Sequence, residues 1–318
     1  MMMADEKQHK NKHKHHRKKK RRWLKWLLIA LGIFILADVA IVGKLYYDAK
    51  KAVDVTYDPV KHDDKRQGNV DLSKKQPFSV LILGTDTGEY GRTYQGRSDT
   101  IMVAAVTPNK TELVSIPRDT LVTIAGHPGN NKINAAYSYD GVSGALNTLQ
   151  NYLDIPIDHY IEINMKGLEQ LSEAIGPVKV NNDLEFTNLG THFAKGEVTI
   201  NSKNILAYTR MRYEDPRGDY GRQMRQRLVL QALVEKAASV NSLAKYHSIL
   251  NAVSANMKTD LTFDQMKEII TNYQGAKNIE QVQLKGDGQM IDGVSYEVVP
   301  KDNLDKIQTQ LKETLKLK

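Results

Sequence analysis

Arginine and carboxylate side chains are dense in the stretch AYTRMRYEDPRGDYGRQMRQR, which spans residues 207–227. It holds six arginines and three carboxylates. Guanidinium groups this close repel one another unless anions lie among them. Forked guanidinium groups are also the side chains best suited to grip phosphate. The stretch therefore predicts either a site for a phosphate-bearing anion or a web of surface pairs between arginines and carboxylates, each contributing about 0–1 kcal/mol.

The spacing within this stretch favours the anion site. Arg210 and Arg212 share a face if their segment is extended, whereas on a helix they would diverge. Arg222 and Gln226 are four residues apart, so both lie on one face near the start of a predicted helix. The N-terminus of a helix adds partial positive charge. Asp219 lies just before this helix. A bound anion would balance the charge of the arginines, and a bound cation would balance the charge of this carboxylate.

Three more charged segments, LGTDTG, GRSDT and IPRDT, lie at the ends of apolar runs. They contribute Asp86, Arg97 with Asp99, and Arg118 with Asp119. If the flanking strands are neighbours, Asp86 and Asp99 could share Mg²⁺, which takes one or two carboxylates and completes its octahedron with phosphate and water. The alternative is that Asp86 forms an ordinary turn and Asp99 a local hydrogen-bond network.

The sequence shows no catalytic nucleophile with a partner. There is no Ser-His-Asp signature, no Walker loop, no zinc spacing and no cysteine. This favours direct attack on phosphorus by a second substrate, while the protein supplies positioning and charge neutralisation.

Alternating helical and strand-like segments must position these residues. Strands are predicted at 78–84, 100–106, 111–117, 158–164 and near 178–182, with helices at 145–153, 165–176 and 225–239. The interleaving predicts an α/β class domain over 77–303 with a mixed central sheet, followed by a C-terminal tail or helix over 304–318.

The N-terminal part has a different composition. The net charge of the chain is +8, and residues 1–22 alone carry ten Lys/Arg against two acids, so residues 23–318 are neutral overall. An apolar segment follows at 23–47, long enough for one transmembrane helix, and then a polar stalk at 48–76. The basic tail predicts a cytoplasmic N-terminus and an extracellular catalytic domain. A cleaved signal peptide is the weaker alternative, and no nucleic-acid partner is expected.

The segments GRSDT, SIPRDT, KINAAYSYDG and RMRYEDPRGDYGRQMRQ occur in this order. In this order and spacing they closely resemble the LytR–CpsA–Psr family of Gram-positive cell-wall enzymes. The resemblance implies an α-β-α layered sandwich that holds a polyprenyl pyrophosphate lipid in an apolar pocket. It also implies transfer of an anionic glycopolymer, such as a teichoic acid or capsular polysaccharide, from a polyprenyl-pyrophosphate carrier to peptidoglycan.

The resemblance carries over to individual residues. It implies that Asp86 and Asp99 hold Mg²⁺ and that Asp219 and Gln226 complete the site. The pyrophosphate would be gripped by five arginines: Arg97, Arg118, Arg210, Arg212 and Arg222. The segment with Lys132, Asn134 and Tyr137 matches a central family motif without a specific role, and Tyr139-Asp140-Gly141 departs from a glycine pair found in many members.

The predicted reaction is attack by a peptidoglycan hydroxyl, by resemblance the muramic acid 6-hydroxyl, on the sugar-side phosphorus. Polyprenyl phosphate leaves, and Asp99 or Asp119 accepts the proton, with Arg97 and Arg118 completing the catalytic set. Two alternatives stay open: a membrane-bound transcriptional regulator, and a polyprenyl-pyrophosphate phosphatase that uses water as the acceptor. Leu228, Val229, Leu233 and Val234 are candidates both for the lipid pocket and for ordinary core.

Overall fold

The computed structural model describes residues 42–63, 65–66, 68–86, 96–237 and 246–317. The predicted basic tail at 1–22 and most of the predicted membrane segment at 23–47 lie outside this part of the chain. Residues 42–56 are helical. Among the described residues, no helix has both the length and the apolar character that crossing a bilayer requires. The chain up to Lys51 is a unit of its own, and everything below concerns the second unit, Ala52–Lys318.

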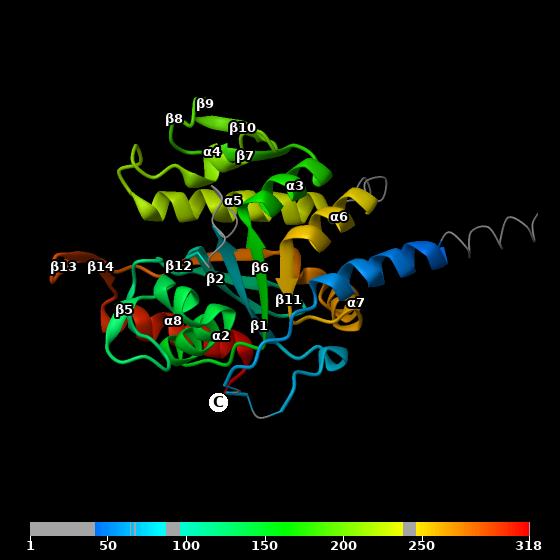
Figure 1. The fold of residues 1–318 in the computed structure, drawn as a ribbon, viewed down its shortest axis with the longest axis horizontal. Coiled ribbons are helices and arrows are strands. Elements are labelled where there is room, and N and C mark those ends of the chain that lie inside the picture. Colours follow the sequence, from blue (N-terminus) through cyan, green and yellow to red (C-terminus); the bar gives the residue numbers. More distant parts are fainter. Residues whose placement is uncertain (1–41, 64, 67, 87–95, 238–245, 318) are drawn as a thin grey trace, which may run out of the picture. The chain divides into compact units, whose positions relative to one another are not determined.

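A mixed six-stranded sheet forms the centre of the second unit (Figure 1). Its apolar strands β1 and β2 pair antiparallel, as do β2 and β3, while β1 with β6 and β3 with β12 are parallel. The predicted strands and the mixed sheet are thereby confirmed. In spatial order the strands are β11 (Met257–Thr259), β6 (His159–Asn164), β1 (Phe78–Thr85), β2 (Ser98–Val106), β3 (Thr111–Ser115) and β12 (Ile279–Gln283).

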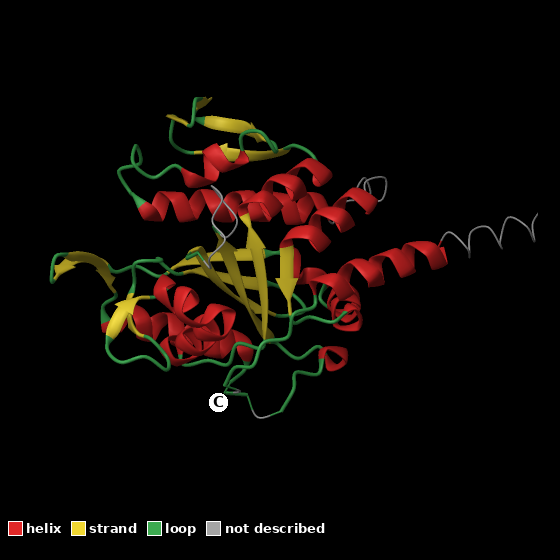
Figure 2. Cartoon of the chain, in the orientation of Figure 1, coloured by secondary structure: helices red, strands yellow, loops and turns green. Residues whose placement is uncertain are grey.

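Helices cover both faces of this sheet, as Figure 2 shows, because its central strands are apolar on both sides. Leu81 and Leu83 of β1 face a core closed by α2 and α8, whereas Val80 and Ile82 face the opposite core. The predicted C-terminal helix is α8, which buries Ile307 in the first core. The helices are α2 (Asn134–Leu153), α3 (Met165–Ile175), α4 (Ile205–Arg210), α5 (Asp219–Ala237), α6 (Tyr246–Asn256), α7 (Phe263–Asn272) and α8 (Lys301–Leu315), with short 3-10 turns at Leu72–Lys74 and Gln274–Lys277.

A further apolar core lies between α3, α4, α5 and short strands beyond the main sheet. These strands form hairpin-like pairs rather than extending the sheet, so the predicted strand near 178–182 is present but lies outside it. The two-stranded pairs are β7 (Val178–Asn182) with β10 (Gly196–Ile200), β8 (Phe186–Asn188) with β9 (Thr191–Phe193), β4 (Leu121–Thr123) with β5 (Asn130–Lys132), and β13 (Asp287–Ile291) with β14 (Val294–Val298).

A buried ion-pair triad fixes the turn that leads into α5. The side chain of Asp215 is fully buried and pairs with Arg225 Nη1 at 2.7 Å and with Arg217 Nε at 2.9 Å. Arg225 is also fully buried, and its guanidinium lies 5.1 Å from the centre of the Phe186 ring. Burial alone would raise the pKa of Asp215, but hydrogen bonds from the two arginines outweigh it and lower the pKa to about 2. Asp215 therefore stays ionised.

Replacing Gly221 by alanine tests how tightly this triad is packed. A Cβ at position 221 would lie 1.8 Å from Asp215 Oδ2. Although alanine is the better helix former, we expect Gly221→Ala to lower the free energy of unfolding by about 1–3 kcal/mol, because overpacking dominates. Thermal unfolding measures this. Gly288→Ala is the matched control, since a Cβ there meets nothing within 4 Å. Equal stability of both variants would contradict the packing described.

Candidate active site

Asp99 is positioned by a bulge in the β1–β2 hairpin. Gly84 is opposite Thr100, but Thr85 is opposite Ser98, so Asp99 is an extra residue in β2. Such bulges redirect a side chain at the end of a strand. Asp86 follows β1 directly, and its Oδ1 accepts a hydrogen bond of 3.0 Å from the backbone N–H of Arg97. The hairpin therefore carries both predicted metal-binding carboxylates at the same end of the sheet.

Arg118 lies between two carboxylates at this end. Its Nη1 donates to Asp99 Oδ1 at 2.6 Å, and its Nε lies 3.8 Å from Asp119 Oδ2. Burial lowers the pKa of Arg118, but the neighbouring carboxylates, Asp99 first, outweigh burial and raise it. Lys132 Nζ holds the other oxygen of Asp119 at 2.8 Å. The sequence indicated no specific role for Lys132, and the structure shows that it forms an ion pair with Asp119.

Arg222 reaches the same end of the sheet from α5. Its Nη2 lies 2.6 Å from Asp219 Oδ1 and donates to the backbone carbonyl of Asp99 at 3.2 Å. The contact with Asp219 is an ion pair of poor hydrogen-bond geometry, because Asp219 Oδ1 has no aligned donor. Burial is the main cause that lowers the pKa of Arg222. The charges of Arg118 and Arg212 also lower it, whereas the carboxylates of Asp219 and Asp99 raise it.

Several buried polar atoms at this place have no hydrogen-bond partner among the described residues. They are Nε of Arg118, Nε of Arg222, Oδ1 of Asp219 and Oε1 of Gln226. A buried donor without a partner costs roughly 1–3 kcal/mol, more when it is charged. Two unsatisfied guanidinium donors beside a lowered arginine pKa are the electrostatic pattern expected of an anion-binding site.

A hydrogen-bond chain through the domain positions Asp219. Gln223 Nε2 donates to Asp219 Oδ2 at 2.7 Å, and Gln283 Nε2 donates to Gln223 Oε1 at 2.7 Å. Arg227 Nη1 in turn donates to Gln283 Oε1 at 2.7 Å, and burial lowers the pKa of Arg227 to about 10. Sequence reasoning missed Gln223 and Gln283, and only the proximity of Gln223 to Arg222 could have suggested the former.

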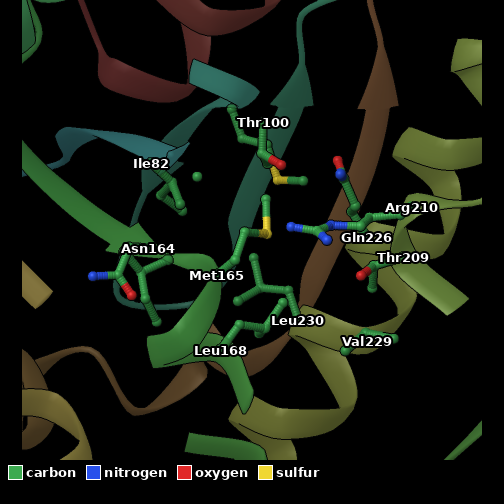
Figure 3. Close-up of a pocket in the computed structure, with 13 residues that line it drawn as sticks. Ile82, Thr100, Asn164, Met165, Leu168, Thr209, Arg210, Gln226, Val229 and Leu230 are labelled. Carbon is green, nitrogen blue, oxygen red and sulfur yellow. The ribbon is translucent and has the colours of Figure 1, made fainter. Parts of the chain in front are cut away.

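An apolar pocket opens beside these charges (Figure 3). Arg210 and Gln226 provide polar groups at its wall, and Met165 extends toward Arg210. Its cavity is about 80 Å³. It is lined by residues of β1, β2, β6, α3, α4 and α5: Ile82, Gly84, Thr100, Met102, Ile163, Asn164, Met165, Leu168, Thr209, Arg210, Gln226, Val229 and Leu230.

One of the four residues considered both for the pocket and for ordinary core lines the pocket. Val229 lines the pocket, but Leu233 is buried in the core of α3, α4 and α5, and Leu228 packs against that core. Val234 is exposed. The structure instead brings Leu230 to the pocket. Gly84 matters for a steric reason: a Cβ there would lie 2.8 Å from the Cβ of Thr100, across the pocket wall.

The arginines of the opening stretch separate into distinct groups. Arg210 ends α4 and faces the pocket, whereas Arg212 lies beyond the helix end and donates to the Tyr213 hydroxyl at 3.0 Å. The side chain of Arg97 is exposed, and its contact with the site is through its backbone. Asp99, Arg118, Asp119, Asp219 and Arg222 form the contiguous cluster.

The carboxylates suit a metal shared with a ligand. Among the described residues, no group of three or more histidine, cysteine or acidic side chains is placed to hold an ion. Asp86 and Asp99 are two carboxylates at neighbouring strand ends, and one oxygen of each already accepts a hydrogen bond. This set fits Mg²⁺, which is commonly held by one or two carboxylates with substrate phosphate and water.

Comparison with known proteins gives matches over most of the chain. The model of the LytR_cpsA_psr family matches residues 43–313. A "Polyisoprenyl-teichoic acid--peptidoglycan teichoic acid transferase TagU" of Enterococcus faecalis is 49% identical over 296 residues, covering 91% of this chain and 97% of the relative.

Solved structures are similar as well. TagU of B. subtilis is 40% identical with a TM-score of 0.62, covering 77% of this chain and 99% of that one. TagT bound to LIIa-WTA is 27% identical with a TM-score of 0.68, covering 82% and 99%. The chain belongs to the LytR–CpsA–Psr family.

Proposed function

We propose that this protein transfers an anionic cell-wall glycopolymer from a polyprenyl-pyrophosphate carrier to peptidoglycan and forms a phosphodiester link. The observation that carries the proposal is the junction of two unlike surfaces. Arg118 and Arg222 present unsatisfied buried donors, and an apolar pocket begins at Gln226, one helical turn from Arg222. A lipid pyrophosphate is an amphiphile whose head and tail match this junction. The curated relative from E. faecalis is named for the same transfer.

The residues of the chain would act by charge and position. Arg118 and Arg222 grip the pyrophosphate, with Arg210 at the pocket wall, and with Arg97 and Arg212 contributing from the rim. The acceptor hydroxyl forms a bond to the sugar-side phosphorus as the bond to the bridging oxygen breaks, and polyprenyl phosphate leaves. Negative charge on the departing phosphate is then stabilised by guanidinium groups fixed in advance.

The proton of the attacking hydroxyl needs a carboxylate beside the reacting phosphorus. Asp99 and Asp119 flank Arg118 and are the two candidates, as the sequence suggests. Asp119 is paired with Lys132 as well, whereas among the described residues only Arg118 donates to the carboxylate of Asp99. Asp219 would orient Arg222, and Gln226 would hydrogen-bond the head group. Mg²⁺ at Asp86 and Asp99 would neutralise phosphate charge.

The proposed location is the outer face of the cell membrane. The basic residues 1–22 and the apolar residues 23–47 support one membrane-spanning helix with a cytoplasmic N-terminus and an extracellular catalytic domain. Lipid-linked polymer and peptidoglycan would then meet where no nucleotide substrate is needed, because the pyrophosphate bond supplies the driving force.

Removing the central guanidinium should abolish most of the activity. We expect Arg118→Ala in the full chain to lower kcat about 10²–10³-fold, the loss typical of a transition-state charge stabiliser. Arg118→Lys should recover only part, because lysine lacks the fork. Coupling of a labelled lipid-linked polymer to glycan strands measures this. Arg66→Ala is the control, since it breaks an Arg–Asp158 pair at the opposite end of β1 and β6. Unchanged coupling by Arg118→Ala would refute the site.

Metal dependence is a separate test. We expect a chelator to stop transfer and added Mg²⁺ to restore it, because without the cation the carboxylates of Asp86 and Asp99 would repel the diphosphate. Asp86→Asn should raise the Mg²⁺ concentration for half-maximal rate about tenfold, through loss of a charged ligand. Full activity in the chelator would exclude this role of the ion.

Filling the pocket should weaken lipid binding alone. We expect Leu230→Trp to raise the KM for the polyprenyl-linked donor about tenfold, since the tail loses apolar contact. Binding of inorganic pyrophosphate should stay unchanged. Val234→Trp, one turn further along α5 at an exposed position, is the matched control. If Leu230→Trp weakened pyrophosphate and donor equally, the pocket would not be the tail site.

A further inference from the structure

A second recess borders the site on the other side of the sheet. Its volume is about 570 Å³, within the roughly 300–1,000 Å³ of typical ligand sites. It lies between β1, β6, β11, the C-terminal end of α6, the kink of α2 and the segment that enters the second unit. We call it the acidic cleft.

The acidic cleft adjoins the apolar pocket at the end of β1. Gly84 lines the pocket and Thr85 lines the cleft, as expected for successive residues of a strand, whose side chains point to opposite faces. Asn164, the residue paired with Thr85 on β6, lines both. Because Asp86 follows Thr85 directly, a molecule in the cleft ends beside the proposed reaction centre.

The charged side chains that line the cleft are mostly acidic. Asp58, Asp140 and Glu162 line it, and its single lining cation among the described residues, Lys258, is paired with Asp58 at 3.0 Å. A polymer of phosphodiesters would be repelled here. The cleft therefore does not suit the anionic donor polymer, whereas a hydroxyl- and amide-rich chain without phosphate meets no such penalty.

Glu162 is held ready to accept hydrogen bonds. Tyr137 OH donates to its Oε1 at 2.7 Å, and Thr85 Oγ1 lies 3.4 Å from the same oxygen. A carboxylate fixed by neighbours loses little freedom when it binds sugar hydroxyls. Val142 and Met257 supply apolar surface in the same cleft, which suits the non-polar face of a sugar ring.

We propose that the acidic cleft binds the acceptor, a glycan strand of peptidoglycan, and delivers its hydroxyl to the site at the end of β1. This inference rests on the proposed transfer reaction. The donor lipid would lie in the apolar pocket and the acceptor in the acidic cleft, on opposite sides of the end of β1. The acidic side chains of the cleft would keep the anionic donor polymer out. Tyr137, known from the sequence only as part of a motif, is thereby a positioning residue for Glu162.

Blocking the cleft tests the proposal in the full-length protein. Ala255 is exposed at the end of α6 and lines the cleft, so Ala255→Trp fills it without disturbing a core. We expect the KM for short uncrosslinked peptidoglycan glycan strands to rise about tenfold or more. Binding of the lipid-linked donor should stay at the wild-type level. Ser248→Trp, also exposed on α6 but outside the cleft, should behave as the wild type.

A second variant probes recognition rather than space. Glu162→Gln keeps the shape but removes the charged acceptor, and we expect about tenfold weaker strand binding, the usual effect of losing a hydrogen bond to a charged group. Calorimetric titration of the strand into protein without donor measures this directly. It is independent of transfer, so it reports on the cleft even if the proposed reaction is wrong.

The outcomes separate the two claims. No transfer by the wild type, with strand binding lost in Ala255→Trp, refutes the reaction and supports the cleft as a glycan site. Normal transfer with an unchanged acceptor KM in both variants refutes the cleft and leaves the reaction standing. A weaker affinity for the donor in Ala255→Trp also overturns the proposal, because the cleft would then hold the donor polymer.

Discussion

The pairing of Asp215 with Arg217 and Arg225 is the interaction on which the arrangement of the site depends. Breaking a buried ion pair costs about 3–5 kcal/mol, because the remaining charge is left without compensation. Arg225 is one turn from Arg222 and next to Gln226 on α5. When the triad fixes the depth and rotation of this helix, it also fixes where Arg222 and Gln226 point. Arg217 and Arg225 therefore stabilise the fold, and Arg222 is left to face a ligand.

The sequence predicted the frame of the site well, for identifiable reasons. Continuous apolar runs indicated β1 and β2 as buried strands, and Asp86 and Asp99 were expected at one end of the sheet if these strands were neighbours. The helical spacing of Arg222 and Gln226 was also sufficient to place both on one face. Local periodicity carries this information because side-chain direction follows from backbone geometry.

Other features depend on contacts that no local pattern encodes. The six arginines of residues 207–227 are chemically alike, yet Arg225 is buried with Asp215, Arg227 bonds Gln281 and Gln283, and Arg210 faces the pocket. Their roles differ because α5 packs on β7 at one side and near β12 at the other. The bulge at Asp99 could not be predicted from the sequence either, because it is a shift of register between two paired strands.

Charge and polarity divide the end of β1 into compartments. The apolar pocket with Arg210 lies on one face, and the cleft lined by Asp58, Asp140 and Glu162 lies on the other. Successive side chains of a strand point to opposite faces of the sheet, so one strand end can line both recesses. Steric constraint keeps the division sharp: Gly84 admits the close approach of Thr100, and any larger residue would push the strand ends apart.

The small volume of the apolar pocket has a physical consequence for the lipid. A cavity of about 80 Å³ is well below the roughly 300–1,000 Å³ of ligand sites, so a polyprenyl tail can enter only if the walls move. Met102 and Met165 line the pocket, and methionine changes rotamer at low cost. Thr100 and Gly84 lie on the rigid sheet, whereas Leu168 and Leu230 lie on helices. Widening is therefore expected by side-chain motion and by displacement of α3 from the sheet, which leaves α5 and the charged end of the hairpin in place.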